Sequence, residues 1–267
     1  MEGNIPIIKI VKIKEFFEMK RELKNPICIH GMPGMGMTGK TVLDHYIKEL
    51  KPEPIKICEI YSTAFPANVV IQKDGSIAPP KITVYAYSNG DKEGKNDLIL
   101  ITGETQPNSV IGTNNLSIEI VKILNDLNVK LLISLAATPV MNPKSSPTVY
   151  ITVTSNELIE KFKKAGVRKE FISGVITGMN GIMPGLAKFE YNINGCALLA
   201  ETYPQFGKDV NASISLIKIL NNYLNLDIPT TDLEVEAKKI EDLYTSLVNK
   251  RKRREQRQKK KDLGYIS

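Results

Sequence analysis

Cysteine and histidine are scarce in this chain of 267 residues, and their scarcity excludes several kinds of site. The three cysteines, Cys28, Cys58 and Cys196, are too few and too widely spaced for a disulfide framework. Together with His30 and His45 they form no ligand cluster of the kind that binds zinc, and two histidines leave little material for a histidine-based catalytic triad. The sequence therefore predicts no metal, no cofactor and no catalytic residues, and reduced cysteines fit a cytoplasmic protein.

Long apolar stretches are also missing. No run of about eighteen or more apolar residues occurs, which is the length that a membrane-spanning helix needs. The first residues, MEGNIPIIKIVKIKE, lack the apolar region and the small-residue cleavage site of a secretory signal. We expect a soluble cytoplasmic protein without a membrane partner.

Positive charge is concentrated near the end of the sequence. The net charge is +7, and the run KRKRREQRQKKK from Lys250 to Lys261 alone carries +8, so the rest of the chain sums to −1 and is close to neutral. Such a run is most often a solvated extension. It could also attract an acidic protein partner, and a nucleic acid is the third interpretation, because the run contains no aromatic or base-reading residue.

Short apolar runs alternate with segments of helical period, a pattern typical of an α/β fold with a mostly parallel, mixed sheet. The continuous runs LILI and LLISL suggest strands that are buried on both faces. Helices are expected after Gly39, around 120–127 and from 157 onward, the last with a capping box at Thr154 and Glu157. The candidate strands are residues 26–30, 55–62, 82–88, 97–102, 130–135 and 148–153.

The strands stop at Asp209, where two helical segments follow. We therefore divide the chain into an α/β core domain (1–208), a C-terminal helical extension (209–249) and a basic tail (250–267). Thr231 and Glu234 have the spacing of a capping box at the start of the second helix. The tail is predicted to be mobile, because it has no apolar residue before Leu263 and its like charges repel one another.

Apolar residues recur at alternating spacings of four and three along the second of these helices, as in a short coiled coil. We call this set the coiled-coil seam, and we expect it to bury itself against another copy of the chain and form a homo-oligomer. The alternative, left open, is that the seam packs on the body of its own chain. The coiled-coil seam consists of Leu233, Ala237, Ile240, Tyr244 and Leu247.

A glycine-rich loop occupies HGMPGMGMTGKT, and from Gly34 to Thr41 it satisfies the G-x-x-x-x-G-K-[ST] pattern of a phosphate-binding P-loop. It follows an apolar strand and opens an amphipathic helix, as a P-loop does. However, none of the candidate strands ends in the acidic residue that would hold magnesium. The favoured interpretation is structural, with glycines that permit a tight turn and close helix packing. The residues at issue are Gly31, Gly34, Gly36, Gly39, Lys40 and Thr41.

Four segments in order carry a family resemblance: GMPGMGMTGKTVLDHYIKEL, EIYSTAFPANVVIQKDGSI, DLILITGETQP and SGVITGMNGIMPGLAKFEYNINGCALLAETYP. The chain resembles the archaeal and bacterial branch of the proteasome assembly chaperone family, sometimes labelled an ATP-grasp superfamily, over about residues 25 to 245. In that family the first glycine loop belongs to the fold and usually lacks the Gly-Lys-Thr ending, and a glycine-rich turn precedes an apolar strand ending E-T-P. Here Pro184 replaces an aliphatic residue and ETYP replaces ETP.

The resemblance implies a three-layer α/β/α fold similar to nucleoside phosphorylases, with added C-terminal helices. It also implies a non-enzymatic protein that binds proteasome α-subunits and promotes their assembly into rings. Some relatives dock through a C-terminal hydrophobic-Tyr-X tail, and here the tyrosine lies one residue earlier than in that pattern. The alternative function is a nucleotide-binding enzyme, P-loop-like or of ATP-grasp type, that uses the loop from Gly34 to Thr41. The predicted partner-binding residues are Leu263, Tyr265, Ile266 and Ser267.

Overall fold

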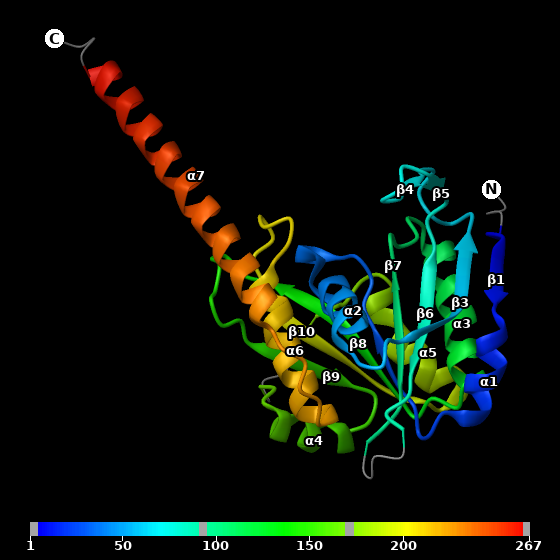
Figure 1. Ribbon diagram of the computed structural model, residues 1–267. Helices are drawn as coiled ribbons and strands as arrows, with labels where there is room; N and C mark the ends of the chain where they lie inside the picture. The colour runs from blue at the N-terminus through cyan, green and yellow to red at the C-terminus, as the bar shows by residue number, and fades with distance from the viewer. Residues whose placement is uncertain (1–4, 91–94, 169–173, 264–267) are drawn as a thin grey trace. The chain divides into compact units, whose positions relative to one another are not determined.

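The apolar runs of the sequence form the middle of one eight-stranded sheet with helices on both faces (Figure 1). The computed structural model describes residues 5–90, 95–168 and 174–263, and of 251–263 the backbone alone. The strands in spatial order are β1 (Ile8–Lys12), β3 (Ile55–Ser62), β6 (Ile82–Tyr87), β7 (Leu98–Gly103), β2 (Ile27–His30), β8 (Leu131–Pro139), β10 (Asn194–Thr202) and β9 (Val149–Val153). A separate hairpin consists of β4 (Val70–Ile71) and β5 (Ile77–Ala78).

The sheet is mixed, with a parallel centre. Strand β2 pairs in parallel with β7 and β8, and β8 pairs in parallel with β10. The other pairs, β1 with β3, β3 with β6, β6 with β7, and β9 with β10, are antiparallel. Strands β3, β7, β2, β8 and β10 therefore run in one direction and β1, β6 and β9 in the other, which confirms the predicted α/β class and its mixed, mostly parallel sheet.

The helices make the outer layers of a three-layer α/β/α arrangement (Figure 1). A continuous apolar core joins one helical layer to the sheet and includes Phe16, Leu116, Ile120 and Met183. None of the helices in the described part of the chain is long and apolar enough to cross a membrane. One layer contains α1 (Lys14–Glu22), α3 (Val110–Asp126) and α5 (Met179–Tyr191), and the other contains α2 (Thr38–Glu49), α4 (Glu157–Ala165) and α6 (Val210–Leu224).

The chain divides into two compact units, Met1–Pro229 and Thr230–Ser267. Helix α6 belongs to the first unit, because it packs on α2, α4 and β10, whereas the sequence prediction placed it in a separate extension from residue 209. The second unit contains α7 (Thr231–Leu263), a single helix whose backbone continues through the expected boundary at residue 250. Whether residues 250–267 are mobile in solution stays a prediction.

Three local expectations were wrong. The glycine-rich segment that the resemblance presents as a turn forms helix α5, which contains Pro184 and packs on β10 where Gly195 has no side chain. The residue at the N-cap of α7 is Thr230 and not the predicted Thr231. The Thr230 carbonyl accepts from Glu234 N–H at 2.9 Å, and its hydroxyl donates to the Glu234 carboxylate at 2.8 Å. The hydroxyl of Thr154 donates to the carbonyl of Gly195 on β10, so it does not cap α4.

The close packing at Gly31 gives a test of stability. A methyl group at Gly31 would lie 2.5 Å from the carbonyl oxygen of Gly39 and 2.7 Å from Leu43 Cδ2. We therefore expect Gly31→Ala to lower the free energy of unfolding by about 2–3 kcal/mol, as overpacking does. The matched control is Gly185→Ala on α5, where a Cβ meets nothing within 4 Å and helix propensity predicts a gain of about 0.5–1 kcal/mol. Denaturant unfolding measures both, and equal changes would contradict the packing argument.

Candidate functional site

The glycine loop is packed into the protein at Gly36 and Gly39, which are buried, whereas Gly34 and Met35 are exposed. It turns through a short 3-10 helix, Met35–Met37, in which Gly36 takes a φ of 60°. The carbonyl of Gly36 accepts from the N–H of Asp209 at 2.8 Å, and a Cβ at Gly36 would lie 2.6 Å from Thr202 Cγ2. The loop therefore needs glycine in order to lie against the end of β10 and the start of α6.

The lysine and threonine of the P-loop pattern have local partners. The Lys40 ammonium lies 2.8 Å and 2.9 Å from the two carboxylate oxygens of Asp44, one turn further along α2, and Thr41 is buried. The buried carboxylate of Asp209 lies beside the loop and accepts from Tyr203 N–H at 2.8 Å and Ala212 N–H at 3.1 Å. An anionic phosphate would meet this negative charge, so the geometry favours the structural interpretation of the motif.

A cleft of about 840 Å³ opens beside this loop at the carboxyl ends of β2 and β8, and we call it the carboxyl-end cleft. Two amide side chains hold its walls together. Gln106 donates to the carbonyl of Pro33 and accepts from Met179 N–H at 2.8 Å. Asn180 accepts from Met32 N–H at 3.0 Å and donates to its carbonyl at 3.2 Å. The hydrogen bonds of Gln106 and Asn180 together fix the loop to the first turn of α5.

The carboxyl-end cleft is uncharged and mixed in polarity. Apolar side chains such as Met35 and Leu199 line it together with polar ones such as Thr138 and Asn180, and its described lining contains no charged side chain. His30 lies buried at the end of β2 with Nδ1 2.8 Å from the Ser134 hydroxyl, and burial lowers its pKa to about 3, so the ring is neutral near pH 7. The described residues contain no group of three or more His, Cys, Asp or Glu side chains that could hold a metal.

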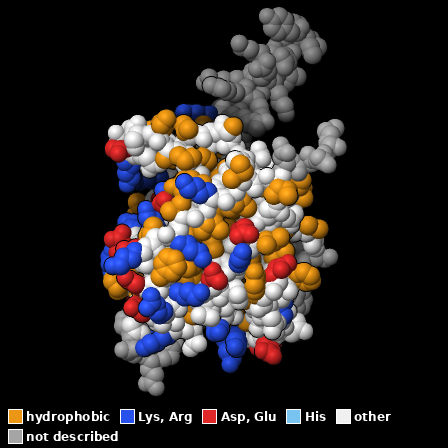
Figure 2. All heavy atoms as spheres, turned by 90° about the vertical axis from the view of Figure 1, so that its right-hand side faces the viewer, with side chains coloured by type: hydrophobic (Ala, Val, Ile, Leu, Met, Phe, Trp, Pro, Cys, Tyr) orange, Lys and Arg blue, Asp and Glu red, His pale blue; other side chains and the backbone are white. Residues whose placement is uncertain are grey.

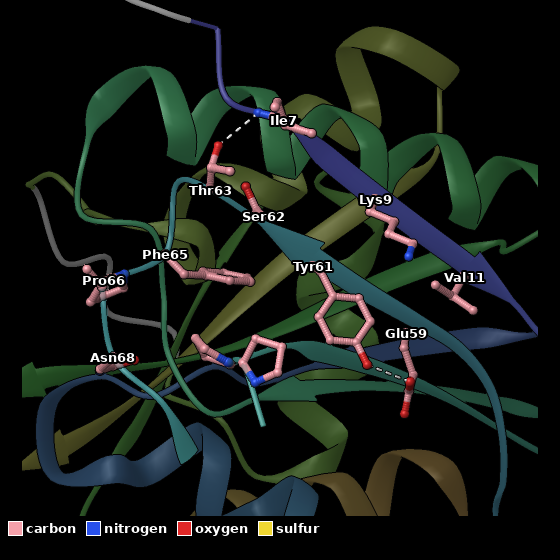
Figure 3. Close-up of a pocket in the computed structure, with 13 residues that line it drawn as sticks. Ile7, Lys9, Val11, Glu59, Tyr61, Ser62, Thr63, Phe65, Pro66 and Asn68 are labelled. Atoms are coloured by element: carbon pink, nitrogen blue, oxygen red, sulfur yellow. Dashed lines mark hydrogen bonds between the residues drawn. The ribbon is translucent and has the colours of Figure 1, made fainter. Parts of the chain in front are cut away.

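A second hollow of about 790 Å³ lies on the open face of β1 and β3, and we call it the edge hollow (Figure 3). Aromatic rings and prolines make most of its wall. Figure 3 shows Tyr61 and Glu59 side by side on β3, with Phe65 on the loop that follows. Sequence reasoning missed this surface, although the alternation of Ile and Lys in IKIVK could have indicated a half-exposed strand. The lining residues are Ile7, Lys9, Val11, Glu59, Tyr61, Ser62, Thr63, Phe65, Pro66, Ala67, Asn68, Pro79 and Pro80.

Glu59 is the electrostatic centre of the edge hollow. Its carboxylate lies 2.7 Å from the Lys81 ammonium and 2.9 Å from the Lys56 ammonium, and it accepts from the Tyr61 hydroxyl at 2.8 Å. Burial by itself raises the pKa of Glu59, but the hydrogen bonds from Lys81, Lys56 and Tyr61 outweigh burial and lower the pKa from 4.5 to about 2. This network holds the floor of the hollow rigid.

The coiled-coil seam is graded in its exposure along α7. Leu233 and Ala237 are buried, Ile240 and Tyr244 are half-buried, and Leu247 is 56% exposed. The end of the seam therefore still offers an apolar surface. Of the predicted partner-binding residues, Leu263 is the last residue of α7, and Tyr265, Ile266 and Ser267 lie outside the described residues.

Comparison with known proteins finds a matching family. Residues 28–248 match the model described as the PAC2 family. Uncharacterized protein MJ1210 of Methanocaldococcus jannaschii is 31% identical over 237 residues, which cover 88% of this chain and 87% of the relative. Uncharacterized protein MJ0106 of the same organism is 29% identical over 248 residues, covering 92% and 95%.

Solved structures with the same fold include two proteins of Pyrococcus furiosus. PbaB, described as an archaeal proteasome activator, is 27% identical with a TM-score of 0.81, covering 90% of this chain and 98% of its own. PbaA, described as an archaeal homolog of proteasome-assembly chaperone, is 25% identical in its monoclinic form with a TM-score of 0.72, covering 95% and 97%. None of these matches is described as an ATP-grasp protein, so that label receives no support from them.

The Glu59 network predicts a pH-dependent stability. Because the folded pKa lies below the unfolded one, the ionised carboxylate stabilises the fold above pH 4.5, and this contribution disappears as the pH falls toward about 2. We expect Glu59→Gln to lower the free energy of unfolding by about 2 kcal/mol at pH 7 and by about half of that or less at pH 3, because part of the contribution is already lost below the unfolded pKa. The control is Glu53→Gln, which removes an exposed carboxylate. Urea unfolding at both pH values makes the measurement, and an equal loss at pH 7 and pH 3 would contradict the role of the charge.

Proposed function

The chain belongs to the PAC2 family, and from this premise we propose that it is a cytoplasmic, non-enzymatic protein of the proteasome assembly chaperone kind. In this proposal it binds proteasome α-subunits and promotes their assembly into rings. The observation that carries the proposal is its likeness to PbaA and PbaB, which extends over nine tenths or more of the chain.

The descriptions of these two structures name different roles, and this gives a second candidate. The higher TM-score, 0.81 against 0.72, belongs to the proteasome activator. An activator acts on the assembled particle, whereas an assembly chaperone acts on its subunits. Both roles require a surface that recognises the proteasome, and they differ in the state of the proteasome that is bound.

The geometry of the glycine loop supports a binding role over catalysis. Lys40 is engaged by Asp44, and the carboxyl-end cleft has no cation or carboxylate among its described lining residues. Among these residues a nucleotide with its magnesium would find neither a cation to pair with its phosphates nor a carboxylate to hold the metal.

The C-terminal segment is the surface that we assign to the partner. Helix α7 has 33 residues, and at about 1.5 Å per residue it spans about 50 Å. It carries the basic run and ends at Leu263, after which Tyr265, Ile266 and Ser267 follow in the sequence. In this proposal the basic run speeds encounter with an acidic surface, and the apolar tip determines how long the complex lasts.

The proteasome assignment is tested with purified archaeal α-subunits. We expect the chain to bind them and to accelerate formation of ring-sized species, observed by native mass spectrometry. Tyr265→Ala should weaken binding by about tenfold or more, as loss of an anchoring aromatic does. Added salt should slow association more than it speeds dissociation.

The matched control is Val235→Ala, which truncates an exposed apolar residue elsewhere on α7. Failure to bind α-subunits in any order of mixing would refute the assembly role. If the chain instead binds the assembled particle and raises its peptide hydrolysis, the activator role replaces it.

We also infer a homo-oligomer that forms through the coiled-coil seam. Leu243 and Leu247 expose apolar surface at the end of the seam, where a second helix would remove it from water. This inference is independent of the identity of the client protein.

The oligomer is tested by changing the seam. Leu247→Glu, and separately removal of residues 230–267, should lower the mass measured by light scattering, because a charge or a missing helix prevents seam pairing. Asn249→Glu introduces the same side chain at an exposed position outside the seam and should leave the mass unchanged. An unchanged mass in all three proteins would show that the seam does not join copies.

A further inference from the structure

Strand β1 is an edge of the sheet, with β3 as its one partner among the described residues. Figure 2 looks onto the side of the molecule that carries β1 and α1, where hydrophobic side chains lie exposed among Lys, Arg, Asp and Glu side chains. An edge strand presents a row of backbone N–H and C=O groups to whatever approaches it. The question is what kind of chain segment would fit here.

The register of β1 determines which backbone groups point outward. Thr63 N–H donates to the Ile7 carbonyl at 3.1 Å, and Ile13 N–H donates to the Ile57 carbonyl at 3.1 Å. Residues that exchange hydrogen bonds alternate with residues that do not in an antiparallel pair. Since Lys9 is opposite Tyr61, the odd-numbered residues face β3. The backbone groups of the even-numbered residues, Ile8 to Lys12, therefore point to the free side.

Hollows lie on both faces of this strand. On one face, Lys9 and Val11 line the edge hollow of about 790 Å³. On the other, Ile8 and Ile10 line a hollow of about 400 Å³ together with Glu119 of α3. Side chains of an added strand alternate between the two faces of a sheet, so each would find a recess beside β1.

The apolar surface continues beyond the edge hollow. Asn68 and Pro79, which line the hollow, flank the hairpin β4–β5 in the sequence. On that hairpin Ile71 is 75% exposed and Ile77 is 69% exposed. The exposed isoleucines of the hairpin thus follow closely in the sequence on the apolar part of the wall, while Lys9 and Glu59 are its charged residues.

Charge on β1 distinguishes a foreign segment from a second copy. Lys9 is exposed and has no ion pair among the described residues, whereas Lys12 is paired with Asp126 at 2.9 Å. Pairing β1 with β1 of another copy would bring two such lysine-bearing strands together, and like charges on neighbouring strands are destabilising. A segment that places a carboxylate near Lys9 would be attracted instead.

We propose that β1 binds an extended segment of a partner protein as an added strand. The segment places a large apolar side chain in the edge hollow, beside Tyr61 and Phe65. Two residues along, on the same face, it places an acidic side chain against Lys9. All residues of this site belong to the first compact unit, Met1–Pro229, and none to α7, so the proposal does not depend on the proteasome assignment.

The experiment selects ligands for the full chain from a random library of nine-residue peptides. We expect enriched peptides to carry an acidic residue two positions from an aromatic or large aliphatic residue. A fluorescein-labelled copy of the most enriched peptide, measured by fluorescence anisotropy, should bind Lys9→Glu about tenfold more weakly, as loss of one charge-assisted contact does. The control Lys130→Glu reverses an exposed lysine before β8 and should bind like the unaltered chain.

A backbone variant tests the mode of binding. Ile10→Pro removes an outward-facing N–H while keeping the pairing with β3, and it should abolish binding; its folding is checked by thermal melting. If the Ile10→Pro protein does not fold, the comparison of Lys9→Glu with Lys130→Glu decides. Absence of enriched peptides, or equal binding by the Lys9→Glu and Lys130→Glu proteins, would overturn the proposal. A dimer in light scattering that dissociates with Ile10→Pro would instead make a second copy the occupant.

Discussion

The structure depends on the contact between Gly31 and Gly39. Here the backbone segments of β2, α2 and β8 approach one another with no side chain between them. A Cβ at Gly31 would lie 2.5 Å from the Gly39 carbonyl oxygen, and a Cβ at Gly39 would lie 2.9 Å from the carbonyl oxygen of Leu135 on β8. Strand β2, helix α2 and strand β8 can approach one another only because both positions are glycine. The position of α2 in turn determines where the loop, the carboxyl-end cleft and the Lys40–Asp44 pair lie.

Much of this architecture was predictable from local patterns. The runs LILI and LLISL form central strands buried on both faces, and the amphipathic segments after Gly39 and around Ile120 are helices, because burial and period agree there. Helix α5 was not predictable in this way. Its glycines and Pro184 lower helix propensity, and it is helical because it packs on α3, β8 and β10.

Local sequence patterns were also insufficient to predict most of the candidate surfaces. The glycine motif matches the phosphate-binding pattern, and the sequence favoured a structural role only because a metal-holding carboxylate was missing. The contacts with Asp209 and Thr202, far along the sequence, are visible in the structure alone. The edge hollow draws Lys9, Tyr61, Phe65 and Pro80 from separate segments, so no local pattern joins them. The coiled-coil seam is the opposite case, because its residues are neighbours on one helix and their period alone predicts it. The helical period does not identify the partner of the seam, and the shape of the edge hollow does not identify the partner of that hollow.

Asp209 links the loop to the helix that follows β10. Its N–H donates to Gly36, and its carboxylate accepts from Tyr203 and from Ala212 in the first turn of α6. Opening the glycine loop would break the bond from Asp209 N–H and leave the buried carbonyl of Gly36 without a donor. Fraying of α6 would remove the Ala212 N–H that donates to the Asp209 carboxylate. We therefore expect the loop and the start of α6 to open as one cooperative unit, with amide hydrogens that exchange with solvent together rather than segment by segment.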